Sequence, residues 1–237
     1  MKKILTLALI SLGAMAFAET WPMTETTGQK LAVRGDGEAD PGYLGIAPAP
    51  DELDAEMTGS EGVILNGKTT VTIPSCPFFS FDKARGFTMS AEVKFLEELD
   101  AVDTGHSRYQ IISRGYDSHK ECWQLRLIRK KNFSPYFLEF FMLVPTDGKK
   151  WFSCKGPVTI LPQTWYRFTV AMDRKTCRLY LNGKEIGAKP CSRLPPTSKA
   201  PILLGIYANG KTMGFPMQIR NFTIEKEVVI PEAHASK

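Results

Sequence analysis

Alternation of apolar and polar residues is the main pattern in this chain, and it predicts short β-strands. In 165–173 the apolar side chains share one parity, and in 87–95 the same pattern recurs. Successive side chains of a strand point to opposite faces, so each stretch should bury one face. The residues expected in the core are Tyr166, Phe168, Val170 and Met172 in the first stretch, and Phe87, Met89, Ala91, Val93 and Phe95 in the second.

Two Asn-Gly pairs predict β-hairpins, because Asn-Gly favours a type I′ turn in which both central residues take positive φ. Asn182-Gly183 joins two short apolar runs, and Asn66-Gly67 separates 63–66 from 70–73. The register expected around the first pair opposes Leu181 to Lys184, Tyr180 to Glu185, and Leu179 to Ile186.

Further apolar runs bring the total to roughly ten strands, spaced about 8–15 residues apart and separated by turn residues. They cover 109–114, 123–128, 137–144, 202–207 and 217–224. The run 137–144 is apolar except at Glu139, so we expect both of its faces to be buried. No stretch makes a convincing helix. This pattern favours an all-β fold, a two-sheet antiparallel sandwich or jelly roll.

Residues 1–18 have the form of a secretory signal peptide. Lys2 and Lys3 give a positive start, 4–13 is mostly apolar, and Ala16-Phe17-Ala18 fits a cleavage site. We expect the mature chain to begin at Glu19 and to be secreted or periplasmic. Residues 19–60 are predicted to be a loop-rich lead-in with an edge strand at most, 61–230 the sandwich, and 231–237 a disordered tail.

The charge balance gives no argument for nucleic-acid binding. The formal net charge is +5, and two of the lysines lie in the predicted signal peptide. A short basic run at Arg126, Arg129, Lys130 and Lys131 is interpreted as a solvated strand end or loop. No run after the signal peptide reaches the ~18–20 apolar residues that a membrane-spanning helix needs.

The chain has five cysteines, an odd number, so at least one is unpaired within a monomer. Export permits disulfides, and Cys177 with Cys191 is the favoured pair because they flank the predicted hairpin. Cys122 with Cys154 is a second option, and five free thiols are a third.

Several short motifs follow one another in a recognisable order. They are FT-x-S-A-x-V-K at 87–94, S-R-G at 113–115, W-x-L-x-L at 123–127, and W-x-x-F-x-V-x-x-D followed by L-Y-L-N-G within 165–183. Over roughly 60–230 the chain resembles the laminin G-like, or concanavalin A-like, jelly-roll domains of exported bacterial proteins. It departs from their usual acidic closing strand by carrying I-R-N-F at 219–222.

This resemblance implies two antiparallel sheets packed face to face, one of them concave. It also implies binding of glycans or proteins through the rim loops or the concave face, in some relatives with calcium. Other relatives are glycoside hydrolases, and the fold alone does not choose among these functions.

Glu52, Asp54 and Glu56 are the sharpest catalytic candidates, because alternate residues of a strand share one face. They resemble the E-x-D-x-E signature of laminarinase-type glycosidases, in which one Glu is the nucleophile and the other the acid/base. Retaining chemistry needs carboxyl groups about 5–5.5 Å apart. The prolines at 48 and 50 and the acidic surroundings favour a solvated loop instead.

Carbohydrate binding needs an exposed aromatic face beside hydrogen-bonding groups. The candidates are Tyr116, Trp151, Tyr207 and Asn209, with structural packing as the alternative for each. Trp123 shares its parity with Leu125 and Leu127, so we expect it in the core. Asp117 is a calcium candidate in a rim loop, although a turn Asp that bonds its own backbone is the simpler interpretation. No motif indicates another cofactor.

The sequence therefore favours an exported, non-catalytic binding module for carbohydrate or a cell-surface partner. The alternatives are a glycoside hydrolase that uses Glu52 and Glu56, and an adhesion or structural module that binds protein.

Overall fold

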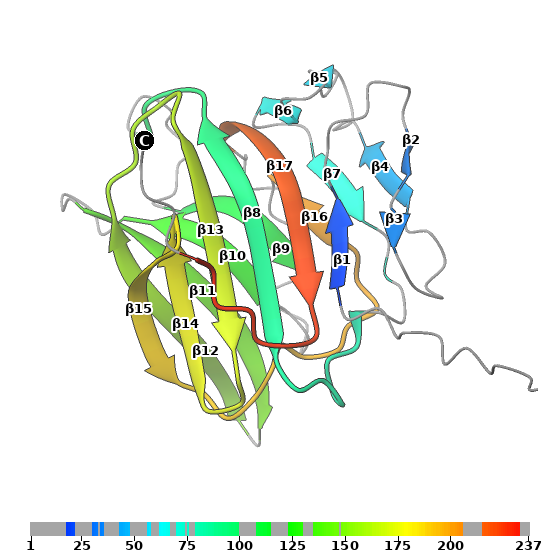
Figure 1. The fold of residues 1–237 in the computed structure, drawn as a ribbon, viewed down its shortest axis with the longest axis vertical. Coiled ribbons are helices and arrows are strands. Elements are labelled where there is room, and N and C mark those ends of the chain that lie inside the picture. The colour runs from blue at the N-terminus through cyan, green and yellow to red at the C-terminus, as the bar shows by residue number, and fades with distance from the viewer. Residues whose placement is uncertain are drawn as a thin grey trace, which may run out of the picture.

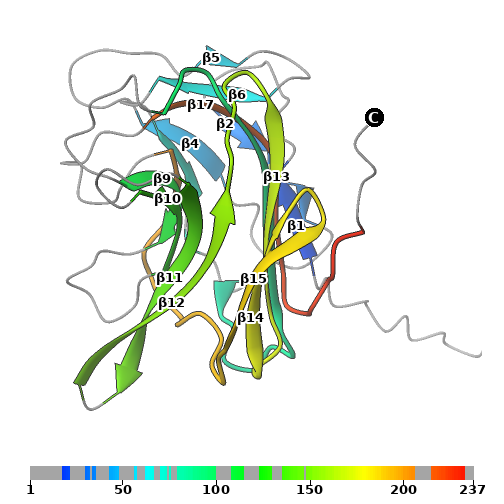
Figure 2. The same cartoon turned by 90° about the vertical axis from the view of Figure 1, so that its left-hand side faces the viewer.

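Two antiparallel sheets pack face to face and enclose an apolar core (Figures 1 and 2), which confirms the predicted two-sheet sandwich. The computed structural model describes residues 62–66, 70–73, 75, 79–99, 108–114, 123–129, 135–146, 148–205 and 215–232, with shorter strands between 18 and 57. Among these residues no helix is long and apolar enough to cross a membrane.

The strands of each sheet lie side by side in the following order, from one edge of the sheet to the other. Sheet A contains β15 (Lys184–Pro190), β14 (Thr176–Leu181), β13 (Trp165–Met172), β8 (Phe87–Phe95), β17 (Pro216–Glu225), β1 (Ala18–Trp21) and β3 (Arg34–Gly35), with β6 (Val63–Asn66) and β5 (Glu56–Met57) joined beside β17. Sheet B contains β12 (Gly148–Val158), β11 (Tyr136–Thr146), β10 (Trp123–Ile128), β9 (Arg108–Arg114), β16 (Ile202–Leu204), β7 (Thr70–Ile73), β4 (Tyr43–Ala47) and β2 (Lys30–Ala32).

The predicted alternation sets the core. The inward side chains of β8 are all fully buried, and those of β13 are buried as well. Across the interior they meet aromatic side chains of sheet B: Phe87 lies 6.0 Å from Trp123 and 6.2 Å from Phe140, ring centroid to centroid. Trp123 is in the core, as its parity predicted.

The Asn182-Gly183 hairpin is confirmed. Asn182 has φ 50° and Gly183 has φ 82°, the two positive values that a type I′ turn requires. Leu181 pairs with Lys184 and Tyr180 with Glu185 as expected. A β-bulge then shifts the register, so that Leu179 pairs with Gly187 instead of Ile186.

The prediction of a hairpin at Asn66-Gly67 is wrong. β6 pairs with β17 and β5 in sheet A, whereas β7 pairs with β16 and β4 in sheet B. Each strand finds a distant partner that buries its apolar face, and those pairings outweigh a local turn preference. The chain therefore changes sheets between 66 and 70.

The lead-in contributes more strands than the single edge strand predicted. β1, β3 and β5 extend sheet A, and β2 and β4 extend sheet B. The first of these, β1, pairs with β17, opposing Glu19 to Ile224. Most of the predicted tail, 233–237, lies outside the described residues.

Arg114 is fully buried and hydrogen-bonds to the segments around Phe79 and around 198–200. Its guanidinium donates to the carbonyl oxygens of Phe79 at 2.9 Å and Ala200 at 3.1 Å, and also to the Ser198 carbonyl. The motif arginine is therefore a structural residue, because a buried guanidinium needs such partners.

The two sheets touch along one edge, where β12 of sheet B meets β15 of sheet A. A Cβ on Gly187 would lie 2.4 Å from the Lys155 carbonyl oxygen, and one on Gly156 would lie 2.6 Å from the Ile186 carbonyl oxygen. Lys189 Nζ also donates to the Ser153 carbonyl at 2.9 Å. Glycine at both positions lets the two backbones come this close.

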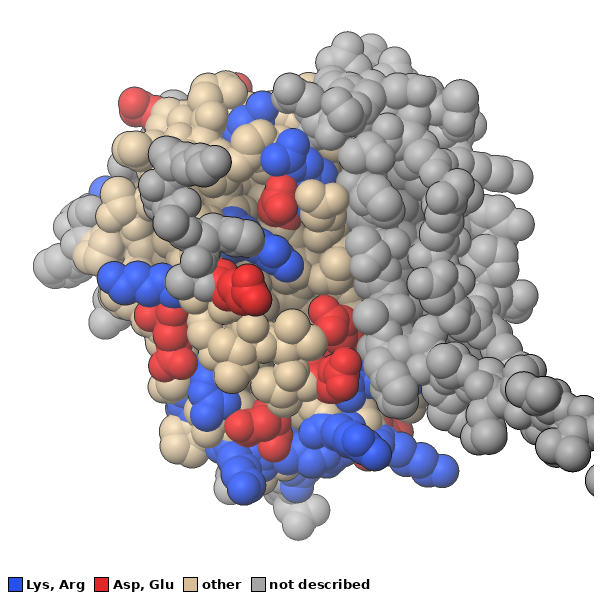
Figure 3. All heavy atoms as spheres, viewed as in Figure 1, with Lys and Arg blue, Asp and Glu red and all other residues tan. Residues whose placement is uncertain are grey.

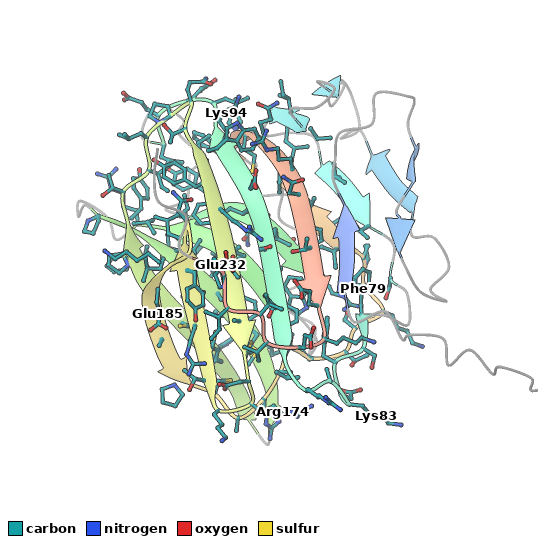
Figure 4. All side chains as sticks on the ribbon, in the orientation of Figure 1. Phe79, Lys83, Lys94, Arg174, Glu185 and Glu232 are labelled. Carbon is teal, nitrogen blue, oxygen red and sulfur yellow. The ribbon has the colours of Figure 1, made fainter. Side chains whose placement is uncertain are left out.

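After β17 the chain crosses the outer face of sheet A (Figures 1 and 2). Thr88 Oγ1 donates to the Glu227 carbonyl at 2.7 Å and accepts the Val229 N–H at 2.9 Å. Glu232 lies over the strands β13 and β14 (Figure 4). This segment, 226–232, leaves the outer face of sheet B untouched, because it lies on the opposite side of the sandwich.

We predict that Gly187→Ala destabilises the protein by about 1–3 kcal/mol, because the new methyl group meets backbone that cannot move without separating the sheets. Gly→Ala at an unobstructed site stabilises by about 0.4–1 kcal/mol, so the sign is diagnostic. Urea unfolding measures it. Ala188→Ser, at the exposed neighbouring position, is the control and should change the free energy of unfolding little. A stabilised Gly187→Ala protein would contradict the close approach.

Candidate functional site

The outer face of sheet B carries a polar and aromatic surface on β9 to β12. Leu125 and Leu127 of β10 point into the core, so Gln124 and Arg126 point the other way. The registers place Arg126 opposite Glu139, and Glu139 opposite Lys155. The same two registers align Gln124, Phe141 and Ser153 in the neighbouring row.

These side chains form one hydrogen-bonded network. Gln124 Oε1 accepts from Gln110 Nε2 at 2.7 Å and from Arg126 Nη1 at 2.8 Å. Arg126 Nε donates to Glu139 Oε2 at 2.7 Å. The other carboxylate oxygen, Oε1, accepts from Ser153 Oγ at 2.5 Å and lies 3.2 Å from Lys155 Nζ. The network thus connects the centre of sheet B to its edge strand, β12.

The Arg126–Glu139 ion pair is buried, with side chains 5% and 4% exposed. Burial by itself raises the pKa of Glu139, but the charges of Arg126 and Lys155 and the hydrogen bonds from Arg126 and Ser153 outweigh it and lower the pKa below 4.5. Glu139 is therefore ionised in the folded protein at neutral pH. The expectation that Arg126 lies in a solvated strand end or loop is wrong, because Glu139 on the adjacent strand holds it.

Aromatic side chains continue the surface towards the tip of the β11–β12 hairpin. The Arg126 guanidinium lies 4.5 Å from the Phe141 ring centroid. Phe141 in turn stacks on Trp151, with centroids 4.5 Å apart and planes at 24°. Trp151 is 42% exposed, unusual for an aromatic residue of this size. The hairpin that carries it reaches beyond the neighbouring strands (Figure 2).

Trp151, Ser153 and Lys155 alternate along β12 and therefore share its outer face. We call these three residues the β12 strip. Trp151 and the Lys155 side chain are exposed, and Ser153 is half-buried. The strip offers an aromatic surface, a hydroxyl and an ammonium group to solvent. Glu139 on the adjacent strand β11 holds the hydroxyl of Ser153 and the ammonium group of Lys155 in place.

Of the predicted carbohydrate-binding residues, Trp151 lies on this surface and is exposed as expected. Tyr116, Tyr207 and Asn209 lie outside the described residues, as do Asp117, Glu52 and Asp54. Glu56 is described only as backbone of β5, where it pairs with Ile64. No group of three or more His, Cys, Asp or Glu in the described part of the chain is arranged to hold a metal ion.

The predicted Cys177–Cys191 disulfide is not present, and both residues are free thiols, as is Cys154. The bulge in the hairpin pairs Cys177 with Lys189, and Cys191 follows the end of β15. The Cys191 thiol donates to the Arg193 carbonyl at 3.3 Å. The alternative partner of Cys154, Cys122, lies outside the described residues.

The outer face of sheet A is different in character. Over the middle of this face lysine and arginine side chains lie beside aspartate and glutamate, and lysines and arginines gather along its lower edge (Figure 3). Trp165 lies under Arg220, whose Cζ is 4.1 Å from the ring centroid, with Lys94 Nζ 5.1 Å away. Arg220 Nε also donates to Glu92 at 2.7 Å. Because Arg220 and Lys94 lie over the Trp165 ring, Trp165 is less available to a ligand than Trp151.

The sequence matches the model of one protein family, in agreement with the two-sheet fold described above. The model described as the concanavalin A-like lectin/glucanases superfamily, in its laminin G-like form, matches residues 65–232. The chain belongs to this superfamily. The superfamily's description covers both lectins and glucanases, so membership does not decide between binding and hydrolysis. No curated protein matches the sequence.

Solved structures show the same fold at low sequence identity. The receptor binding domain of botulinum neurotoxin C/D mosaic serotype has a TM-score of 0.62 at 14% identity, covering 90% of this chain and 48% of that one. The binding domain of Paraclostridial Mosquitocidal Protein 1 has 0.59 at 16%, covering 91% and 49%. The ligand binding domain of botulinum neurotoxin serotype D, in complex with N-acetylneuraminic acid, has 0.56 at 16%, covering 84% and 46%. This chain thus spans about half the length of each.

We predict that Arg126→Ala lowers the free energy of unfolding by about 3–5 kcal/mol, because it leaves the Glu139 carboxylate buried without its main partner. Arg108→Ala, at an exposed position of the adjacent strand β9, is the matched control and should cost at most about 0.5 kcal/mol. Urea unfolding at pH 7 compares the two variants. Equal losses would show that the buried pair has no special role.

The same network makes stability depend on pH. Since the pKa of Glu139 is lowered on folding, its contribution is fully present above 4.5 and is lost as pH falls through the folded value. We expect the free energy of unfolding of the wild type to fall with pH over this range more steeply than that of Glu139→Gln. Parallel curves would contradict the assignment.

Proposed function

We propose that this protein is an exported, non-catalytic binding module whose ligand is carbohydrate, bound at the β12 strip. The observation that carries the proposal is the exposed Trp151 indole, supported from below by Phe141 and flanked by Ser153 and Lys155. A sugar presents apolar C–H faces and hydroxyl groups. An aromatic face beside fixed donors and acceptors complements both.

The buried network supports this proposal by preorganising the strip. Glu139 accepts from Ser153 and attracts Lys155, and Arg126 holds Glu139 in place. Fixed polar groups lose less conformational entropy when a ligand binds. Arg126 and Glu139 are too buried to contact a ligand directly, so they act as positioning residues.

Glycoside hydrolysis is less well supported by this surface. A retaining glycosidase needs a second carboxyl group about 5–5.5 Å from the first, and one of the two must keep a proton. Glu139 is the sole carboxylate on the described side chains of β9 to β12, and its lowered pKa keeps it ionised. The Glu52 and Glu56 alternative depends on side chains outside the described residues.

Export is part of the proposal. The signal-like segment would be removed after Ala18, and β1 begins at that residue, so Glu19 to Trp21 remain to pair with β17. A protein recovered outside the cytoplasm with Met1 intact would contradict this cleavage.

We predict that Trp151→Ala weakens binding to a glycan by about 10- to 100-fold, the range for losing a central aromatic contact. A glycan array identifies the sugar, and isothermal titration then gives the affinities. Trp165→Ala removes the same side chain from the outer face of sheet A and is the matched control, expected to bind like the wild type. Unfolding curves verify that both variants are folded.

Other outcomes would separate the alternatives. Equal weakening by both tryptophan variants, or a blank array, would contradict the glycan site. Hydrolysis of a β-glucan by the wild type, abolished by Glu52→Gln, would replace the proposal with the glycosidase. A blank array together with saturable binding to a purified cell-surface protein would favour the adhesion module.

A further inference from the structure

Three cysteines gather where the two sheets meet. Cys154 is on β12, Cys177 is on β14, and Cys191 directly follows β15. They are 1%, 0% and 9% exposed. The carbohydrate site does not use them, because Cys154 points inward between the outward-facing Ser153 and Lys155.

Cys154 and Cys177 face each other across the two sheets. Cys154 Sγ lies 3.5 Å from the Cys177 carbonyl oxygen, to which it donates. The close approach of β12 to β15 fixes this juxtaposition, because β15 is the hairpin partner of β14. The Cys191 thiol donates to the Arg193 carbonyl.

We propose that Cys154 and Cys177 form a disulfide that joins sheet B to sheet A, and that Cys191 remains a thiol. The structure describes the reduced form of this pair. An exported protein meets disulfide-forming conditions, so the predicted compartment permits the bond. Its two halves come from β12 and β14, which are otherwise linked only by non-covalent contacts.

The oxidant is a small or protein disulfide, for example oxidised glutathione. The Cys154 thiolate attacks one sulfur of that disulfide and releases one reduced thiol, leaving Cys154 in a mixed disulfide. The Cys177 thiolate then attacks the Cys154 sulfur and releases the second thiol. The two cysteines lose two protons and two electrons, and the oxidant gains them.

Because both sulfurs are buried, exchange must take place before the edge of the sandwich closes during folding. Once formed, the bond would limit the conformations of the unfolded chain and so stabilise the fold. It would also anchor β12 between Ser153 and Lys155. The consequence for binding is a more rigid strip, although the bond itself does not depend on the ligand.

The test is refolding of the full chain in a buffer of oxidised and reduced glutathione, followed by alkylation and trypsin digestion without reduction. Trypsin cuts beside Lys150, Lys155, Lys175 and Arg178, which places Cys154 and Cys177 on separate short peptides. We expect mass spectrometry to find peptide 151–155 linked to 176–178, with Cys191 alkylated. We also expect the oxidised protein to melt roughly 5–10 °C above the same protein in dithiothreitol.

Variants separate this bond from general effects of reduction. Cys177→Ser should lose the difference in Tm, and the matched Cys191→Ser should keep it. Alkylation of both Cys154 and Cys177 under oxidising conditions would overturn the proposal. So would a link from Cys177 to Cys191, or from Cys154 to Cys122. Peptide mapping of the wild type decides the matter even if a serine variant fails to fold.

Discussion

Gly156 and Gly187 let two backbones from opposite sheets touch, and this contact determines where β12 lies. Without it β12 would be a free edge strand, prone to pair with another chain. With it, the strand is held against β15 on one side and paired to β11 on the other. The inward residues of β12 then meet sheet A, and its outward residues form a fixed surface. The β12 strip lies on the outer face of this strand, and Cys154 lies on its inner face.

Sheet B is buried on both faces over much of its width, which is unusual for an antiparallel sheet. The inner face is apolar, whereas the outer face holds Arg126 and Glu139. A buried ion pair contributes little net stability, because removing two charges from water offsets most of their attraction. Its presence is better explained by what it orients than by what it stabilises. Here it orients Ser153 and Lys155 on the exposed edge.

The sequence is enough to predict the sandwich, because alternation with period two reports directly on which residues are buried. Parity with Leu125 and Leu127 predicts Trp123 in the core, whereas Trp151 is predicted on the surface because it follows the turn residues at 147–150. The sequence does not predict the network, because Arg126 and Glu139 meet only through the register of β10 and β11. One signal was available: Glu139 is the single charge in an apolar run, and such a residue needs a partner of opposite sign.

Local signals fail where long-range pairing competes with them. Asn66-Gly67 is as good a turn sequence as Asn182-Gly183, yet β6 and β7 belong to different sheets. A single bulge residue in the β14–β15 hairpin likewise shifts the register, so that Cys177 pairs with Lys189. No sequence pattern predicts this bulge.

The path of residues 226–232 has a practical consequence for handling this molecule. That segment lies on the outer side of sheet A, whereas the β12 strip is on the outer side of sheet B (Figure 2). An affinity tag or a sensor-chip linkage placed after Glu232 would leave the protein from the side opposite the strip. Immobilised in this way, the domain would present Trp151 to the flowing solution.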